Sequence, residues 1–293
     1  MTDYLNEAAI RSLEASGDYR VLRRVPEPHM LEDEAMIAGA QRIAIVDVET
    51  TGLDPESDSI IEIAVMHMLV DRDRGCELVG HGKPQSWLED PRCPLDPRIE
   101  ALTGLDNAML EGHAIDDKAV IDMLEGADVI IAHNAAFDAA FVERRWPVLR
   151  GLRWACSCHE IDWPALGYEG RSLPHLLMQS GFFNNAHRAA DDVWSLHHLL
   201  TWVMPGSGGE EGRCHLDRLL EASETETFRI EATHAPFRAK DQLKARGYRW
   251  DAARRVWWIE IGPDGFLDEK VWFDERGLPP FTFSRLSAAQ RHR

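Results

Sequence analysis

The stretch that decides the fold reads Ile43-Ala44-Ile45-Val46-Asp47-Val48-Glu49-Thr50-Thr51-Gly52-Leu53. Its first four residues are apolar and mostly β-branched, which predicts a buried strand. The strand then reaches two carboxylates, Asp47 and Glu49, before the turn residues. Because side chains two positions apart share a face of a strand, both carboxylates are expected to point the same way at the end of a core element.

Two like charges at the end of a buried strand repel one another, and removing them from water is costly. A cation lying between them would remove both costs. The ligands are hard oxygen atoms with no Cys or His nearby, so the pair predicts Mg²⁺ or Mn²⁺. A solvated strand end without an ion is the alternative, and it would be preferable if the pair stood alone.

Two further segments combine a core element with chemically active side chains. Val129–Ala132 is a second strand-like run, and His133-Asn134-Ala135-Ala136-Phe137-Asp138 follows it. Further along, His187 precedes Asp192 by five positions at the start of a predicted helix. A histidine in a loop and an aspartate in the following helix can face one pocket.

Together the three segments resemble the exonuclease motifs of the DnaQ-like, DEDDh family, which includes the DNA polymerase III ε-subunit and RNase T. The matching residues are Asp47-x-Glu49-Thr-Thr-Gly-Leu, His133-Asn-x-x-Phe-Asp138 and His187-x-Ala-x-x-Asp192. The resemblance covers residues 41–204, and three ordered motifs are far more specific than one. It implies an α/β domain with a ribonuclease-H-like mixed central sheet flanked by helices.

The resemblance also implies a 3′→5′ exonuclease that releases nucleoside 5′-monophosphates by a two-metal mechanism. The four motif carboxylates would hold two Mg²⁺ or Mn²⁺ ions, and His187 would be the general base. The expected substrate is nucleic acid with a free 3′ end, with single-stranded DNA favoured over RNA. The choice of Asp192 rather than Asp191 rests on the family's spacing. Asp191 could instead cap the helix, since Asp near a helix start is favoured.

The same resemblance places a second group of residues beside the terminal nucleotide. Glu62 occupies that place in the family, although its pattern alone predicts an exposed strand residue. Leu53 or Phe137 is expected against the terminal base. His133 has a second interpretation, as a turn histidine whose ring is satisfied by the backbone. The expected substrate contacts are Thr50, Thr51, Leu53, Glu62, His133, Asn134 and Phe137.

The net charge of −18 is unusual for a nucleic-acid enzyme, because phosphate binding calls for Lys and Arg. The charge is uneven: residues 228–293 hold 13 basic and 9 acidic residues, which leaves 19 basic and 41 acidic residues in 1–227. The acidic part contains the predicted catalytic residues. We therefore expect metal ions and local contacts, rather than a basic surface, to hold the substrate there.

Composition and the family resemblance together divide the chain into four parts. Residues 1–40 are expected to form a helical extension, including a second helix near 30–40. The resemblance assigns residues 41–204 to the exonuclease domain. Residues 205–227 open with a Gly- and Ser-rich run that is typical of a linker. Residues 228–293 predict a small α+β module.

Arg and Trp residues alternate in the predicted strands of this module. Such side chains could stack on bases and hold phosphates, which predicts nucleic-acid contacts. The alternative is that the tryptophans form the core that a small domain needs. The candidate contacts are Arg249, Trp250, Arg254, Arg255 and Trp257.

Five cysteines without a framework spacing predict a reducing compartment, and hence a cytoplasmic protein. No apolar run approaches about 18 residues, so no membrane span or membrane partner is expected. Cys156-x-Cys158-His159 is too tightly spaced for an ordinary zinc site, which stays a minor alternative. A polymerase or repair partner is consistent with the resemblance, as are two alternative functions: RNA trimming like that of RNase T, and non-catalytic nucleic-acid binding.

Overall fold

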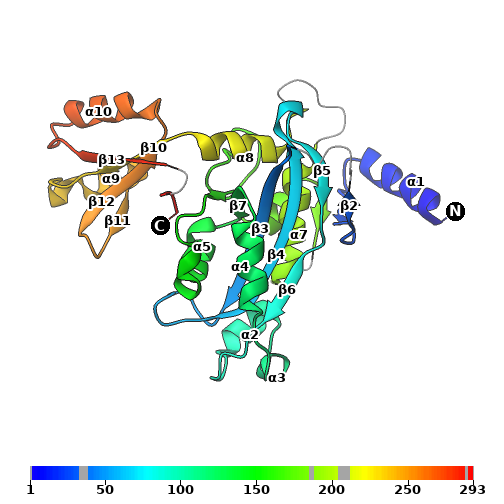
Figure 1. The fold of residues 1–293 in the computed structure, drawn as a ribbon. Helices are drawn as coiled ribbons and strands as arrows, with labels where there is room; N and C mark the ends of the chain where they lie inside the picture. The colour runs from blue at the N-terminus through cyan, green and yellow to red at the C-terminus, as the bar shows by residue number, and fades with distance from the viewer. Residues whose placement is uncertain (1, 33–38, 185–187, 204–211, 288–289, 293) are drawn as a thin grey trace. The chain divides into compact units, whose positions relative to one another are not determined.

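The computed structural model describes residues 2–32, 39–184, 188–203, 212–287 and 290–292. They belong to two compact units, one of residues 1–220 with 292–293 and the other of residues 221–291 (Figure 1). Each unit has its own sheet and its own hydrophobic core.

The first unit is built on a seven-stranded mixed sheet. Its strand order is β2-β5-β4-β3-β7-β8, and β6 also pairs with β4. Strand β3 pairs antiparallel with β4 and parallel with β7, which pairs parallel with β8. The predicted mixed α/β sheet is confirmed. The strands are β2 (Leu31–Glu32), β3 (Gln41–Thr50), β4 (Ile60–Asp71), β5 (Glu77–His81), β6 (Gln85–Leu88), β7 (Val129–Ala132) and β8 (Trp154–Cys156).

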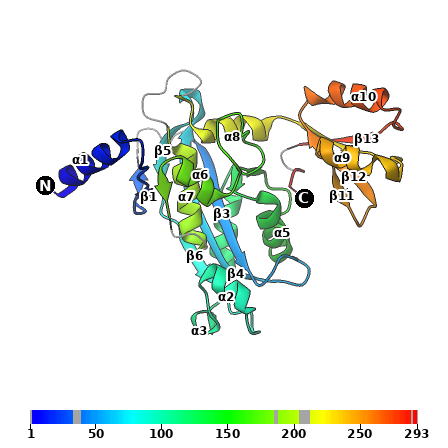
Figure 2. The ribbon, with the colours of Figure 1, turned by 180° about the vertical axis from the view of Figure 1, so that it is seen from behind.

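Alternation along β3 separates the two faces of this sheet. Ile43 and Ile45 pack with the core on the side of α6 (Leu173–Gln179) and α7 (Ala189–Thr201). Ala44, Val46 and Val48 pack against α4 (Asp117–Glu125) and α5 (Ala135–Arg145). Figure 1 shows α4 and α5 in front of the sheet, and Figure 2 shows α6 and α7 on the opposite face. Asp47 and Glu49 share the spacing of Ile43 and Ile45, so they belong to the α7 face.

The N-terminal extension contains one described helix, α1 (Thr2–Ala15), rather than two. The helix predicted near 30–40 is wrong at Leu31–Glu32, which form β2 and pair antiparallel with β5. Residues 33–38 lie outside the described part of the chain. The pairing gives the backbone groups at this edge of the sheet their hydrogen-bond partners. Upstream, β1 (Arg23–Arg24) pairs parallel with β9 (Phe182–Phe183).

Short helices connect the strands of the first unit. Helix α2 (Pro97–Thr103) ends at Gly104, which has the positive φ of 68° that glycine adopts without strain. Asp96 caps the start of α2 by accepting a bond from the backbone N–H of Arg98. The remaining short elements are η1 (Arg72–Arg74), α3 (Asn107–Leu110) and η2 (Pro147–Leu149).

The predicted linker contains folded structure. Residues 204–211 lie outside the described residues, but α8 (His215–Glu224) occupies most of the described residues between 212 and 227. Leu216, Leu219 and Leu220 are at most 1% exposed and pack into the core of the first unit. Their spacing of three and four residues forms one apolar stripe, which explains why this stretch folds as a helix against the domain.

The second unit is a four-stranded antiparallel sheet of order β11-β12-β10-β13. Its strands are β10 (Thr227–Glu231), β11 (Arg249–Asp251), β12 (Val256–Ile261) and β13 (Thr282–Leu286). Its helical elements are η4 (Phe237–Ala239), α9 (Lys240–Arg246) and α10 (Gly265–Glu275). Strands β11 and β12 pair antiparallel and carry the Arg and Trp residues of the predicted strands.

The two faces of the second sheet differ in character. Ile230, Trp257 and Ile259 share the face that packs against Leu243 and Phe273 of the helices. Arg229 and Trp258 occupy the opposite face, with the Arg229 guanidinium 4.1 Å from the centre of the Trp258 ring. We call this second surface, with Glu231 and Asp251, the open face. The neighbouring tryptophans of β12 therefore have different environments because a strand alternates its side chains.

Candidate active site

Three of the predicted catalytic carboxylates meet at one end of β3. Asp47 and Glu49 come from that strand, and Asp192 comes from the first turn of α7. One oxygen from each lies within 4.8 Å of the others, and all three side chains are half-buried. Across the described residues, this is the one group of three or more His, Cys, Asp or Glu side chains with that geometry.

Asp138 reaches the same end of the sheet from α5. It is only 4% exposed, and its Oδ1 accepts a hydrogen bond from the Val48 backbone N–H at 3.2 Å. Val48 lies between Asp47 and Glu49, so this bond fixes α5 against the acidic strand end. Asp138 also contributes to the raised pKa of Asp47 through charge repulsion. The acidic edge, as we call these four carboxylates, thus draws on all three predicted segments.

The raised pKa values of these acids indicate that holding their charges together is unfavourable. Burial, followed by repulsion from Asp138 and Asp192, raises the pKa of Asp47 well above its usual range. Burial, again with repulsion from Asp192, raises the pKa of Glu49 to about 7. Burial raises the pKa of Asp138 to about 7. A divalent cation would relieve this repulsion with oxygen ligands of the type it prefers, so the acidic edge is compatible with metal binding.

The turn after Glu49 is folded tightly on itself. A register shift between Glu49 and Thr50 interrupts the pairing of β3 with β4, as a β-bulge does beside many active sites. The Thr50 hydroxyl donates to the Gly52 carbonyl, and the Thr51 hydroxyl donates to Asp58. A Cβ at Gly52 would lie 2.4 Å from an Asp58 oxygen, which explains the glycine. The threonine hydroxyls therefore support the turn.

Leu53 follows this turn as one of the most exposed apolar residues. Its side chain is 84% exposed. Phe137, from the first turn of α5, is partly buried, and its ring centre lies 4.9 Å from that of Phe141. Leu53 is thus open for contact with a base, whereas Phe137 already belongs in part to the core.

Glu62 is fully buried, so the expectation of an exposed strand residue is wrong. It lies directly opposite Glu49 across the β3–β4 pair. Both of its carboxylate oxygens accept hydrogen bonds from the Arg188 guanidinium at 3.1 Å, and Oε2 also accepts one from the Ala189 backbone N–H at 3.2 Å. This carboxylate is therefore engaged with α7.

His133 and Asn134 form the corner between β7 and α5. The His133 ring lies 2.9 Å from the Ser157 hydroxyl and 2.7 Å from the Arg171 carbonyl through its two nitrogens. Burial lowers the pKa of this histidine to about 4, which favours the neutral ring. These contacts agree with the alternative of a turn histidine satisfied by its surroundings. Asn134 is exposed at the start of α5.

The third motif is described only in part. His187 lies outside the described residues. Asp192 belongs to the acidic edge, whereas the neighbouring Asp191 is exposed. The first backbone N–H of α7 is bonded to Glu62, so the cap is supplied by a carboxylate from another strand rather than by Asp191.

Two residues of the site were not predicted. Arg188 pairs with the buried Glu62, and the Asn184 side-chain amide donates to Asp192 at 3.3 Å. The position of Arg188 directly after His187 in the sequence was a signal that it belongs to the site. Its partner lies 126 positions away, and sequence spacing does not reveal it.

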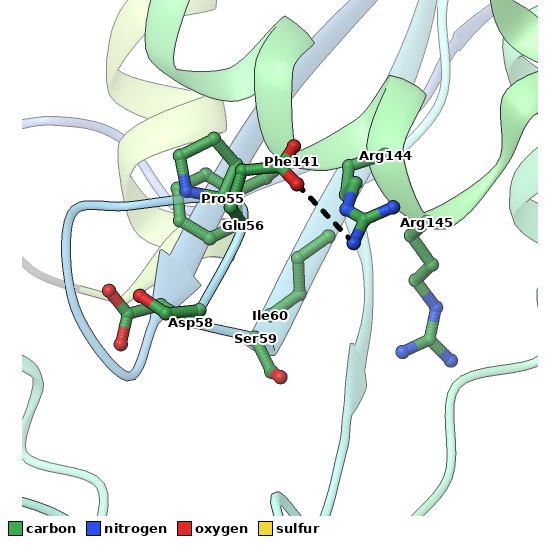
Figure 3. A pocket seen from close by; sticks show the side chains of 9 residues that line it. Pro55, Glu56, Asp58, Ser59, Ile60, Phe141, Arg144 and Arg145 are labelled. Carbon is green, nitrogen blue, oxygen red and sulfur yellow. Dashed lines mark ion pairs between the residues drawn. The ribbon is translucent and has the colours of Figure 1, made fainter.

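A cavity of about 300 Å³ lies between the turn after β3 and the end of α5 (Figure 3). Pro55, Ser57 and Ser59 line it together with Phe141. Arg144 extends across it to Glu56, with the two charged groups 3.5 Å apart and largely exposed. The acidic edge does not line this cavity, so the cavity and the candidate catalytic centre are different features.

The remaining predicted residues are the cysteines of the zinc alternative and the candidate nucleic-acid contacts of the second unit. Cys156 is buried, and Cys158 is partly exposed; both carry free thiols. The residues described include no Cys-containing group with metal-ligand geometry, so the zinc alternative gains no support. In the second unit, Trp250 is 50% exposed, whereas Trp257 packs against the core. Arg249, Arg254 and Arg255 are exposed, although Arg254 pairs with Glu231.

Known proteins resemble this chain over the segment that contains the acidic edge. The model of the exonuclease family RNase T matches residues 44–199. A PolC-type DNA polymerase III of Thermotoga maritima is 29% identical over 154 residues, which are 52% of this chain and 11% of the polymerase. A ribonuclease T of Shewanella putrefaciens is 33% identical over 114 residues, which are 34% of this chain and 50% of that protein.

A solved structure of exonuclease I has a similar fold. It superimposes with a TM-score of 0.50 at 13% identity, over 82% of this chain and 68% of that chain. The likeness concerns the fold, which is ribonuclease-H-like as predicted. The chain spans half or less of the length of the two relatives in sequence. No helix in the described ranges is long and apolar enough to cross a membrane.

Proposed function

The chain belongs to the RNase T exonuclease family, and from this premise we propose that it is a metal-dependent 3′→5′ exonuclease. Family membership identifies a nuclease that hydrolyses nucleic acid; the direction, the DNA substrate and the metal ions are the proposal. The observation that carries it is the convergence of Asp47, Glu49 and Asp192 within 4.8 Å at the end of a buried strand. Such a group is electrostatically tolerable when a cation occupies it.

The four carboxylates of the acidic edge would hold two Mg²⁺ or Mn²⁺ ions. When bound, such ions lower the pKa of a water molecule and stabilise the leaving 3′ oxygen. Asp138 is held by the Val48 N–H, and α7 orients Asp192, so the ligands are positioned before the substrate arrives. His187 is the proposed general base for the attacking water, since an imidazole with a pKa near 6.5 suits that role.

The turn after Glu49 is the proposed site for the terminal nucleotide. Leu53 projects from it and offers an apolar surface to the terminal base. The hydroxyls of Thr50 and Thr51 are engaged within the turn, so their proposed contribution is to hold its shape and present backbone groups. Glu62 and His133, whose polar atoms are already hydrogen-bonded, are proposed to shape the pocket, whereas the exposed Asn134 is proposed to contact the nucleotide.

DNA is the proposed substrate because a PolC-type DNA polymerase III is among the relatives, and this relative also supports a polymerase or repair partner. The ribonuclease T relative supports a second candidate, trimming of RNA 3′ ends. We expect end-labelled single-stranded DNA to be shortened from its 3′ end in Mn²⁺ or Mg²⁺, faster than duplex DNA or RNA. Release of 3′-monophosphates, or turnover in EDTA, would contradict the mechanism. Faster RNA digestion would favour the second candidate.

Variants test the assignment of the third motif. Replacement of His187 by Ala should lower turnover by about 10²–10⁴-fold, the usual range for a general base. Asp192→Asn should abolish turnover, whereas Asp191→Asn should leave it within about twofold because that side chain is exposed. If Asp191→Asn were inactive and Asp192→Asn active, the assignment would be wrong.

A further inference from the structure

The start of α7 depends on a residue from a distant strand. Arg188 directly precedes this helix, and arginine is not a residue type that usually caps a helix. Glu62 of β4 supplies the missing acceptor, because its Oε2 receives the Ala189 backbone N–H at 3.2 Å. A carboxylate at this position also interacts favourably with the positive end of the helix dipole.

Arg188 connects this cap to the acidic edge. Its guanidinium donates two hydrogen bonds to Glu62, one to each oxygen, at 3.1 Å. Its backbone carbonyl accepts the N–H of Asp192 at 3.0 Å. A single residue therefore joins a fully buried carboxylate on one side to a proposed metal ligand on the other. The bidentate geometry restricts rotation more than a single contact would.

The charge arrangement supports the same connection. Glu62 and Glu49 are directly opposite across two antiparallel strands, where like charges destabilise a sheet. Arg188 lowers the pKa of Glu49 against the larger effects of burial and neighbouring acids. The arginine thus compensates a buried negative charge within the sheet and leaves the outer carboxylates to a metal ion.

We propose that Glu62 and Arg188 form a latch that positions α7 so that Asp192 faces Asp47 and Glu49. The proposal rests on the proposed metal-dependent function of the acidic edge. Neither latch residue is a catalytic residue, because each acts through Asp192. The latch also gives Glu62 a role other than the nucleotide contact expected from the family resemblance.

Binding of Mn²⁺ distinguishes positioning from a simple counterion effect. If Arg188 only neutralised charge, Arg188→Met would bind Mn²⁺ more tightly, because a repelling cation is removed. If the latch positions Asp192, the same variant should bind Mn²⁺ about 10–100-fold more weakly, the usual effect of losing a residue that orients a metal ligand. Calorimetric titration of the full chain measures this without any nuclease activity.

Activity and hydrogen exchange complete the test. Arg188→Met and Glu62→Gln should each lower kcat by about 10–100-fold with little change in KM, and Arg188→Lys should recover part of the loss. Since the two residues act as one unit, the double variant should be no worse than the poorer single variant. Amide exchange in residues 189–195 should accelerate in Arg188→Met. Arg144→Met, which removes the exposed pair with Glu56, is the matched control and should match the wild type.

The possible failures are separable. Unchanged or tighter Mn²⁺ binding by Arg188→Met, in a variant that keeps the wild-type circular dichroism spectrum, would overturn the latch. Fully multiplicative losses in the double variant would also overturn it. If Arg188→Met does not fold, Glu62→Gln and the double variant, which leave no buried charge, decide the question. A wild-type chain that binds Mn²⁺ but degrades no strand would instead overturn the proposed exonuclease function.

Discussion

The acidic edge of the first unit and the open face of the second unit both gather charged side chains, but they balance them differently. In the acidic edge, burial raises the pKa of Asp47, and the surrounding carboxylates raise it further. On the open face, Glu231 lies between Arg229 and Arg254, and Arg229 also pairs with Asp251. Opposite charges held together offset one another, whereas like charges held together at a half-buried strand end repel, and a bound cation would relieve that repulsion.

The difference indicates how a role can be inferred from charge. A cluster that neutralises itself is explained by the stability of the sheet. Carboxylates that repel one another at the end of a buried strand lower stability, and a bound ion would relieve that repulsion. The Glu62–Arg188 pair combines both situations, because it neutralises one acid within an otherwise acidic site.

The largest expected effect comes from the centre of the acidic edge. Asp47→Asn should lower turnover by about 10⁴-fold, since several kcal/mol of metal-dependent transition-state stabilisation is lost. The same variant should raise the melting temperature in EDTA by roughly 2–4 °C, the shift produced by relief of about 1 kcal/mol of repulsion. Asp122→Asn, at an exposed pair on α4, is the control. A lower melting temperature in Asp47→Asn would show that the carboxylates do not destabilise the metal-free fold. It would therefore contradict the contrast between the acidic edge and the open face.

Replacement of Trp250 tests whether the second unit binds single-stranded nucleic acid. This side chain is half exposed, and stacking of one base on a tryptophan contributes about 1–3 kcal/mol. Trp250→Ala should therefore weaken single-stranded DNA binding by roughly 5–100-fold in a fluorescence anisotropy assay. Val271→Ala, which changes an apolar residue of similar exposure, should bind normally. Equal affinities for both variants would leave the Arg and Trp residues with a structural role alone.

Replacement of Glu231 tests whether the paired charges of the open face stabilise the second unit. Glu231→Gln removes the carboxylate shared by Arg229 and Arg254, so it should lower the free energy of unfolding of the second unit by about 1–3 kcal/mol. Turnover of a short oligonucleotide should not change. Chemical denaturation followed by circular dichroism measures the stability, with Glu226→Gln at the exposed pair with Arg285 as the control. A faster or slower nuclease would contradict the assignment of this cluster to stability.

The smallest expected effect is the release of about one or two protons when Mn²⁺ binds. Because the folded pKa values of Glu49 and Asp138 are raised to about 7, the metal-free fold holds protons that the unfolded chain has lost between about pH 4 and 7. Stability in EDTA should therefore fall as pH rises through this range. Mn²⁺ binding should release about one or two protons at pH 6 and almost none at pH 8.5. Calorimetry in buffers of different ionisation enthalpy would contradict this if release were equal at both values.

Much of the site could be predicted because its chemistry is local in the sequence. The apolar run before Asp47 and Glu49 indicates a strand within a few residues. The residues around Asp192 indicate the start of a helix in the same way. The acids converge as expected because each lies at the end of a regular element in a sheet with helices on both faces. The residues that support those acids were harder to predict, as Arg188 and Asn184 show.

Similar limits applied to the fold. The predicted helix near Leu31 is a strand in the structure, because the edge of β5 offers hydrogen bonds that a local pattern does not reveal. The stretch predicted as a linker contains α8, whose leucines are buried by the rest of the domain. Trp257 and Trp258 are adjacent in sequence, and only the position of the helices decides which of them enters the core.

By itself, the sequence determined the exonuclease motifs, the mixed α/β architecture and the identity of the acidic side chains, because residue type and periodicity encode these directly. Only the tertiary structure decided that Glu62 faces Arg188, that Asp192 joins the acidic edge while Asp191 is exposed, and which tryptophan of β12 is covered. The physical reason is that these outcomes depend on strand register and helix packing, which bring together residues separated by many positions in the chain.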